Sequence, residues 1–331
     1  MDEYRFRPGS AFFAHRRLEP PTAGAELVDV TLGIDSSAIC TWLADTGTGI
    51  ALSPSDLTAG HLRPAATPVV VACQDGDGKV SQTWDIPNPM DGASYQVLPE
   101  GHLLARAHYL TIIEEDFRRR AIVYDPGGSI VSMGSFHAEA EYVRATRNGA
   151  VWVAHEAMTF EDDCYPVPGL ARYSTDLQLQ WEPDKELQID PGPLSVLGDG
   201  VVFFDYERGA PYLSAEESWM KDQPEAFGWV LHDPESRRWG FVEDQTPGHL
   251  NVTLGWTDLH GRWKPFSRGP IAVPVASPME HTSVECDASA IHTWVGQRWY
   301  SLTLSDLFDD SVRSIAPRLP DVSSEEEEPQ Q

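Results

Sequence analysis

The chain has 331 residues, and 24 lysines and arginines stand against 51 aspartates and glutamates, which gives a formal net charge of −27. No apolar run approaches the roughly 20 residues that span a bilayer, and so strong a negative charge repels nucleic acids and anionic lipid surfaces. The composition therefore favours neither a nucleic-acid partner nor a membrane partner. The first 18 residues are charged and have no apolar signal core, so we expect a cytoplasmic protein.

The residue types favour an all-β fold. The chain contains 26 glycines and 26 prolines, and they separate short runs rich in valine, isoleucine and aromatic residues. Helical periodicity is confined to two short segments, 215–220 and 304–312. The cysteines have no zinc or redox spacing, so we expect reduced, mostly buried thiols at Cys40, Cys73, Cys164 and Cys286.

A repeated motif links the two ends of the chain. Asp35-Ser-Ser-Ala-Ile-Cys-Thr-Trp42 returns as Asp287-Ala-Ser-Ala-Ile-His-Thr-Trp294. Looser copies, in which a turn pair precedes an apolar strand, begin at Glu100, Asn148 and Asp199. The repetition indicates one structural unit used several times.

A second recurring element has the form strand, aspartate-containing turn, strand. Its copies are centred on Asp75, Asp125, Asp176, Asp233 and Asp258. The combined unit recurs at about 45–65 residues, the length that a four-stranded antiparallel sheet needs. Six such units are expected, with five or seven as alternatives, and a pair of β-sandwiches is the competing architecture.

These strand and turn patterns over residues 25–305 resemble the blades of β-propellers, closest to the NHL-type and lactonase-like propellers. The resemblance implies one propeller domain over residues 1–320, followed by a disordered acidic tail at 321–331. The Gly-His and Trp-Asp signature of WD repeats and the calcium-ligand set of gluconolactonases are absent, so no site residue is carried over. A propeller ring must close, and we expect residues 10–15 to supply the missing outer strand of the last blade.

Candidate site residues come from the segments expected to lead into the innermost strands. Loops of that kind converge at one mouth of a propeller channel. The residues with binding chemistry are Asp91, His137, Asp190, His249 and His281. A divalent metal would take the three histidines His137, His249 and His281 as nitrogen ligands, with a carboxylate to orient a ligand or act as general base.

Two other groups of side chains have simpler structural roles. Most tryptophans fall at corresponding strand positions and are expected to pack between blades, whereas Trp219 and Trp229 flank a charged segment, 216–225, where a short helix or lid is expected. The acidic runs at 161–163 and at Asp205-Tyr206-Glu207 are expected to be solvated rim loops, because they lack the ligand spacing of a calcium loop.

The function expected from the sequence is binding without catalysis. Nucleophile-elbow, P-loop, dinucleotide-binding and HExxH motifs are absent, so no catalytic constellation stands out. We expect a monomer that binds a small molecule or a protein; the sequence establishes no cofactor and leaves a divalent metal open. The alternative is a metal-assisted lyase or hydrolase that uses the histidines at the channel mouth, and the sequence leaves open whether the protein is an enzyme.

Overall fold

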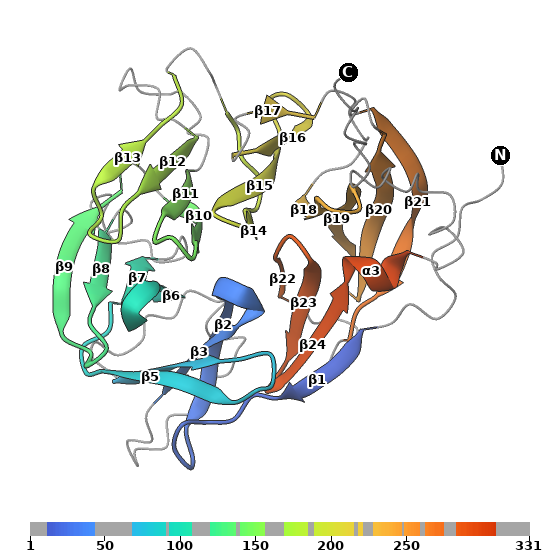
Figure 1. Cartoon of the computed structure of the whole chain (residues 1–331). Coiled ribbons are helices and arrows are strands. Elements are labelled where there is room, and N and C mark those ends of the chain that lie inside the picture. Colours follow the sequence, from blue (N-terminus) through green and yellow to red (C-terminus); the bar gives the residue numbers. More distant parts are fainter. Residues whose placement is uncertain are drawn as a thin grey trace, which may run out of the picture.

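A computed structural model describes residues 12–43, 68–90, 93–107, 120–136, 140–155, 169–184, 189–214, 218–220, 228–246, 248–258, 262–274 and 283–308. Its strands form six four-stranded sheets in which neighbouring strands are antiparallel. The sheets stand around a common axis as the blades of a six-bladed β-propeller (Figure 1). The expected all-β propeller with six four-stranded blades is confirmed.

Each blade is formed from strands taken in chain order from the axis outward. Blades 1 to 5 are β2–β5, β6–β9, β10–β13, β14–β17 and β18–β21, and blade 6 is β22, β23, β24 and β1. The inner strands are β2 (Glu26–Leu32), β6 (Ala93–Val97), β10 (Ala140–Ala145), β14 (Ser195–Leu197), β18 (Trp229–Asp233) and β22 (Val284–Cys286). The second strands are β3 (Ala38–Leu43), β7 (Leu103–Ala107), β11 (Val151–His155), β15 (Gly200–Asp205), β19 (Arg238–Thr246) and β23 (Ala290–Val295).

The outer halves of the blades complete the sheets. The third strands are β4 (Val69–Gln74), β8 (Arg120–Tyr124), β12 (Leu170–Tyr173), β16 (Ala210–Leu213), β20 (His249–Thr257) and β24 (Arg298–Thr303). The outer strands are β5 (Val80–Ile86), β9 (Ile130–Ser135), β13 (Leu179–Trp181), β17 (Ser218–Trp219), β21 (Trp263–Ala272) and β1 (Phe13–Arg17). Inner strands all run in one direction, so the ring has an entry end, where each inner strand begins, and a first-hairpin end, where it turns into the second strand.

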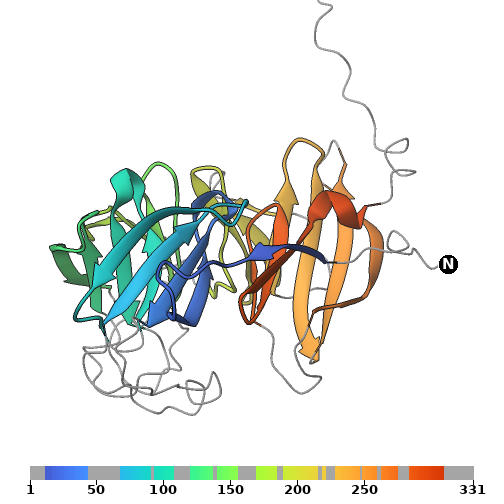
Figure 2. The ribbon, with the colours of Figure 1, turned by 90° about the horizontal axis from the view of Figure 1, so that it is seen from below.

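The ring is closed by the N-terminal strand, as expected. β1 pairs antiparallel with β24, so the first strand of the chain completes the last blade (Figures 1 and 2). The strand occupies Phe13–Arg17 instead of residues 10–15. Leu18 follows it, is fully buried, and donates its backbone N–H to the carbonyl of Gln297 at 2.7 Å. One closed sheet edge and one buried leucine therefore join the two ends of the propeller.

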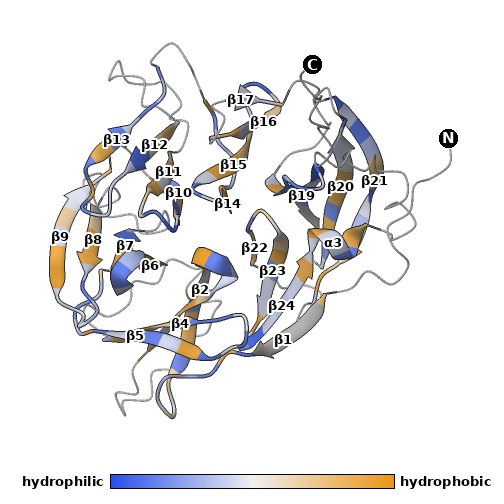
Figure 3. Ribbon diagram, in the orientation of Figure 1, coloured by the Kyte–Doolittle hydropathy of each residue, from blue (hydrophilic) through white to orange (hydrophobic). Residues whose placement is uncertain are grey.

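The core lies between adjacent blades. One apolar cluster joins strands of blades 1 and 2 and includes Trp84 and Tyr95, and the next joins blades 2 and 3 around Phe136. Second and third strands such as β3 and β4 are buried along their whole length, and Figure 3 shows apolar stretches on the strands of the blades. The tryptophans of four second strands are buried, as expected for packing residues: Trp42, Trp152, Trp239 and Trp294. Each blade face is thus covered by its neighbour, which an isolated four-stranded sheet cannot achieve.

Two sequence-based assignments need correction. Ser218 and Trp219 form the outer strand β17 and not part of a helix, because they pair with Leu213 and Tyr212 to finish blade 4. The second assignment concerns the Asp233 turn, which joins the first and second strands of blade 5 instead of its outer pair.

Helical structure is confined to short pieces in the part of the chain that the structure describes. A four-residue helix, α3 (Leu304–Leu307), starts within the expected segment 304–312, and Thr303 and Asp306 form its capping box. Within the described residues, no helix is both long and apolar enough to cross a membrane. Three of the cysteines are confirmed as free and buried, namely Cys40, Cys73 and Cys286.

Candidate functional site

Two of the five sequence-predicted site residues lie in the described part of the chain. Asp190 lies five residues before Ser195, the first residue of the inner strand β14, as expected for an entry segment. His249 is the exposed first residue of β20, the third strand of blade 5. Asp91, His137 and His281 lie outside the described residues.

His249 does not lead into an inner strand. Its hairpin joins β19 to β20, which places it at the entry end of the ring but two strands outward from the axis. The difference arises because the first turn of blade 5 runs through Asp233 and lacks the turn pair ending in glycine that the first hairpins of blades 2, 3 and 4 have. The Asp233 turn resembles the outer hairpins in sequence. The sequence therefore predicts that the next strand after it is an inner strand, although His249 begins a third strand.

Asp190 is held in place by a buried carboxylate. Its backbone N–H donates to Asp205 Oδ1 at 3.1 Å, and its carbonyl accepts from the N–H of Tyr206 at 2.7 Å. Asp205 is fully buried and also accepts from Trp219 Nε1 at 2.8 Å. The expectation of a solvated rim at Asp205 was therefore wrong, because this side chain fixes the backbone that enters β14.

The surroundings of Asp190 are electrostatically negative. Partial burial, followed by the charges of Asp205 and Glu207, raises the pKa of Asp190. Burial, together with the charges of Glu141 and Asp190, likewise raises the pKa of the Tyr206 phenol. A carboxyl group whose pKa is raised by neighbouring negative charges lies in a field that attracts a cation.

Aromatic side chains adjoin these carboxylates. Tyr142 on β10 makes an edge-to-face contact with Trp229, the first residue of β18, with ring centroids 6.0 Å apart. Burial and the neighbouring Glu141 raise the pKa of Tyr142, and the pKa of Tyr142 is also raised by the charge of Tyr206. Glu141, Tyr142, Asp190, Tyr206 and Trp229 are named the acidic-aromatic mouth below. They come from blades 3, 4 and 5.

The position of Trp229 depends on a glycine. Gly228 has a φ of 102°, and a Cβ placed there would lie 2.3 Å from the carbonyl oxygen of Val242. Only glycine adopts this conformation without strain, so the chain can enter β18 close beside β19.

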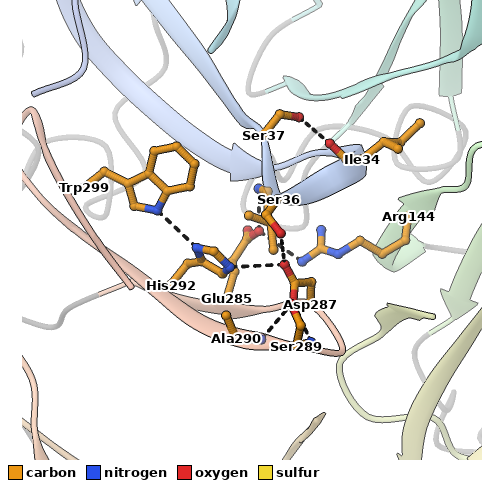
Figure 4. Close-up of polar contacts among 11 residues, drawn as sticks. Ile34, Ser36, Ser37, Arg144, Glu285, Asp287, Ser289, Ala290, His292 and Trp299 are labelled. Carbon is orange, nitrogen blue, oxygen red and sulfur yellow. Dashed lines mark hydrogen bonds and ion pairs between the residues drawn. The ribbon is translucent and has the colours of Figure 1, made fainter. Parts of the chain in front are cut away.

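The first-hairpin end of the axis is crossed by polar contacts (Figure 4). Glu285 Oε2 accepts the N–H of Leu32 at 2.6 Å and pairs with Arg144 Nη2 at 3.0 Å, which joins blade 6 to blade 1 and to the opposite blade 3. The turn after β22 continues across: Ala288 donates to the Val196 carbonyl of blade 4 at 3.2 Å and accepts from the His232 N–H of blade 5 at 2.7 Å. Side chains and one turn thus connect five of the six blades at this end.

Asp287 is the centre of a second hydrogen-bond group at that end (Figure 4). Its Oδ1 accepts from the N–H groups of Ser289 at 2.6 Å and Ala290 at 2.9 Å, and its Oδ2 accepts from Ser36 Oγ and from His292 Nε2 at 3.2 Å. Burial alone would raise the pKa of Asp287, but the hydrogen bonds from His292, Ser289 and Ser36 hold it well below its usual range.

This group of serine, histidine and aspartate does not form a nucleophile and its base. Ser36 donates to the carboxylate and not to the imidazole. Trp299 Nε1 donates to His292 Nδ1 at 3.1 Å, so the proton of the neutral ring sits on Nε2 and faces Asp287. Both ring nitrogens are used, so His292 has no free basic nitrogen to activate a hydroxyl. The arrangement stabilises the closure of the ring.

The described residues do not form a metal site. Over the described ranges, no group of three or more histidine, cysteine, aspartate or glutamate side chains is placed to hold a metal ion. Two of the three expected histidine ligands, His137 and His281, lie outside those ranges, so the metal site remains a prediction.

The chain was compared with protein families, curated proteins and solved structures. No family model and no curated protein matches the chain. Among solved structures it is similar to virginiamycin B lyase from Staphylococcus aureus, with 11% identity over 84% of this chain and 95% of that one and a TM-score of 0.42. A DUF4221 protein from Bacteroides vulgatus gives 8% identity over 88% and 97%, with a TM-score of 0.43. The periplasmic gluconolactonase of Pseudomonas aeruginosa gives 14% identity over 70% and 72%, with a TM-score of 0.38. At these values the similarities carry no argument about activity, and the propeller assignment rests on the strand topology.

The sequence alone did not identify Glu141, Tyr142 or Tyr206 as site residues. Tyr206 belongs to the acidic run Asp205-Tyr206-Glu207 at a strand exit, a pattern that predicts a solvated rim. Trp229 had been singled out as an exception to packing, and it does lie on an inner strand.

Proposed function

We propose that this protein is a binding propeller whose ligand carries a cationic group, an ammonium or a guanidinium, held at the acidic-aromatic mouth. The observation that carries the proposal is the meeting of half-buried aromatic rings and carboxylates from three blades at the entry end of the axis. A cation over an aromatic face gains electrostatic energy from the ring, and adjacent carboxylates add to it.

The chain already contains one contact of the kind expected for the ligand. The guanidinium carbon of Arg144 lies 5.5 Å from the centroid of Trp229. Tyr206 is 42% exposed, so part of its ring remains available on the solvent side of the mouth. The opposite end of the axis is crossed by the Asp287 turn, which supports the entry end as the side from which a ligand approaches.

Calorimetric titration with arginine amide and with tetramethylammonium tests the proposal. We expect saturable binding that weakens about tenfold in Asp190→Asn and in Tyr206→Ala. Asp199→Asn, a change of the same charge in the first hairpin of blade 4 at the opposite end, is the control and should bind as the wild type. Equal weakening in the control, or the absence of saturable binding, would contradict the proposal.

Metal analysis of tag-free protein separates this role from the metal-assisted alternative. A binding propeller should be purified without stoichiometric transition metal. An enzyme that uses His137, His249 and His281 should contain one metal ion per chain and lose it in His137→Ala.

A further inference from the structure

Exposed apolar side chains gather on one outer strand. Of the five large hydrophobic residues found exposed in the described part of the chain, three lie on β9: Ile130 at 53%, Val131 at 53% and Met133 at 66%. Leu179, at 38%, lies on β13, the outer strand of the next blade. Figure 3 shows the apolar stretch of β9 on the outer edge of its blade.

β9 has one free backbone edge. It pairs with β8 on one side and ends its sheet on the other. Edge strands of stable proteins are commonly blunted by charge, proline or short length, because the free edge is a template for another strand. β9 has six residues, Ile-Val-Ser-Met-Gly-Ser, with no charge and no proline.

The other outer strands differ in this respect. β21 contains Lys264, Pro265, Arg268 and Pro270, β1 ends in two arginines, and β5 contains Asp85. β13 and β17 are three and two residues long. Among the outer strands that the structure describes, β9 is thus the one that is both long and without these protections.

Three aspartates lie in the hairpin of β9 and in the neighbouring blades on its two sides. Asp125 stands in its own hairpin and accepts from Gly127 and Ser129. Asp85 of blade 1 approaches through its carbonyl oxygen, which would lie 2.6 Å from a Cβ at Gly128. From blade 3, the carbonyl of Asp176 accepts from Ser132 Oγ at 3.4 Å. Asp85 and Asp176 are exposed, and Asp125 is half-buried. The chain as a whole carries a charge of −27, so a second copy would be repelled and a basic partner attracted.

We propose that β9 is a docking edge for an extended, basic segment of a partner protein, which adds to blade 2 as a fifth antiparallel or parallel strand. Main-chain hydrogen bonds along the free edge supply affinity, and the apolar side chains of the segment cover Ile130, Val131 and Met133. Lysine or arginine side chains of the segment face Asp85, Asp125 and Asp176. This surface is separate from the acidic-aromatic mouth, so it serves a macromolecular partner whatever ligand the mouth takes.

Fluorescence anisotropy with labelled peptides tests the inference on the full chain. The probe is a capped peptide of alternating lysine and valine, and its comparison peptides alternate glutamate with valine or carry a central proline. We expect the lysine–valine peptide to bind and both comparison peptides to bind at least about tenfold more weakly.

Matched variants place the binding on β9. Met133→Lys adds a positive charge to an exposed position of β9 and should weaken the binding of the lysine–valine peptide about tenfold. Ala272→Lys adds the same charge to an exposed position on the outer strand of blade 5 and should not change the affinity. Equal loss in the two variants, or no loss in either, means attraction by net charge alone and overturns the inference.

Sedimentation of the protein without peptide distinguishes a second copy as the occupant. We expect a monomer in the wild type and in Met133→Lys. A wild-type dimer that Met133→Lys converts to a monomer would show that β9 pairs with itself, which overturns the assignment to a basic partner.

Discussion

Ser36 in the first hairpin of blade 1 donates its hydroxyl hydrogen bond to Asp287 in the first hairpin of blade 6 (Figure 4). The two residues belong to the two copies of the Asp-x-Ser-Ala-Ile-x-Thr-Trp motif, which are 252 positions apart in numbering, from 35 to 287. The copies meet because the blades that contain them are the first and last of a closed ring. Their aspartates nevertheless differ: Asp287 is buried, whereas Asp35 forms an exposed ion pair with Arg147.

Replacement of each motif aspartate by asparagine tests this difference. Asp287→Asn removes an acceptor of the Ser36 and His292 hydrogen bonds in a buried place and should lower the free energy of unfolding by about 2–4 kcal/mol. Asp35→Asn is the matched control and should leave the denaturation midpoint unchanged, because its pair with Arg147 is exposed to solvent. Equal effects of the two changes would contradict the distinct role of Asp287.

The stability that Asp287 provides depends on pH. Its pKa is lower in the folded protein than in the unfolded chain, where it is about 3.9, so its contribution is present above that pH and is lost as the pH falls below it. The stability difference between wild type and Asp287→Asn should therefore be constant from pH 5 to 7 and shrink below about pH 4. Urea denaturation at a series of pH values measures this stability difference. A difference that grows on acidification would contradict the lowered pKa of Asp287.

The ion pair across the axis supports another prediction. Arg144→Met leaves the half-buried Glu285 without its ion-pair partner and should cost about 3–5 kcal/mol. Glu285→Gln keeps an acceptor for the Leu32 N–H and should cost less. In a double-mutant cycle the two changes together should cost less than their sum, since the second removes the charge that the first leaves unpaired. Additive costs would indicate that the pair is not coupled.

Closure by the N-terminal strand predicts a global effect of truncation. Removal of residues 1–18 exposes the edge of β24 and the apolar surface that Leu18 covers. The melting temperature of the whole domain should therefore fall. Leu18→Ala keeps the strand and should cost about 2–5 kcal/mol through the cavity it leaves.

Removal of residues 323–331 is the control for this truncation. That segment lies outside the described residues and contains no apolar side chain, so its loss should not change the melting temperature. Unchanged melting after removal of residues 1–18 would contradict closure by β1.

The propeller was predictable from the sequence because its hairpins repeat. The motif at Asp35 and Asp287 and the turns at Asp75, Asp125 and Asp258 all occupy the hairpins that the repeat assigned to them. The Asp233 turn was misplaced, since it has neither the glycine turn pair of blades 2, 3 and 4 nor the repeated motif of blades 1 and 6, and its Asp-Pro start matches the outer hairpin at Asp125. That single error moved His249 away from the inner strands.

The site was less predictable than the fold. Asp190 could be found because it precedes a recognisable inner strand. Glu141, Tyr142 and Tyr206 could not, because their proximity depends on how blades 3 and 4 pack around the axis. Period-2 patterning shows which residues share the face of one strand, and it contains no information on which strands face each other across the ring.

Fluorine NMR of protein labelled with 3-fluorotyrosine tests the proposed binding role most directly. Resonances of Tyr142 and Tyr206 are assigned through Tyr142→Phe and Tyr206→Phe, and Tyr300 on β24 serves as a remote reference. Titration with arginine amide should shift the Tyr142 and Tyr206 signals along one saturable curve and leave Tyr300 unchanged, and sodium acetate should shift none of them. Shifts of Tyr300 equal to those of Tyr206, or no saturable shift of either mouth tyrosine, would contradict a cation site at the acidic-aromatic mouth.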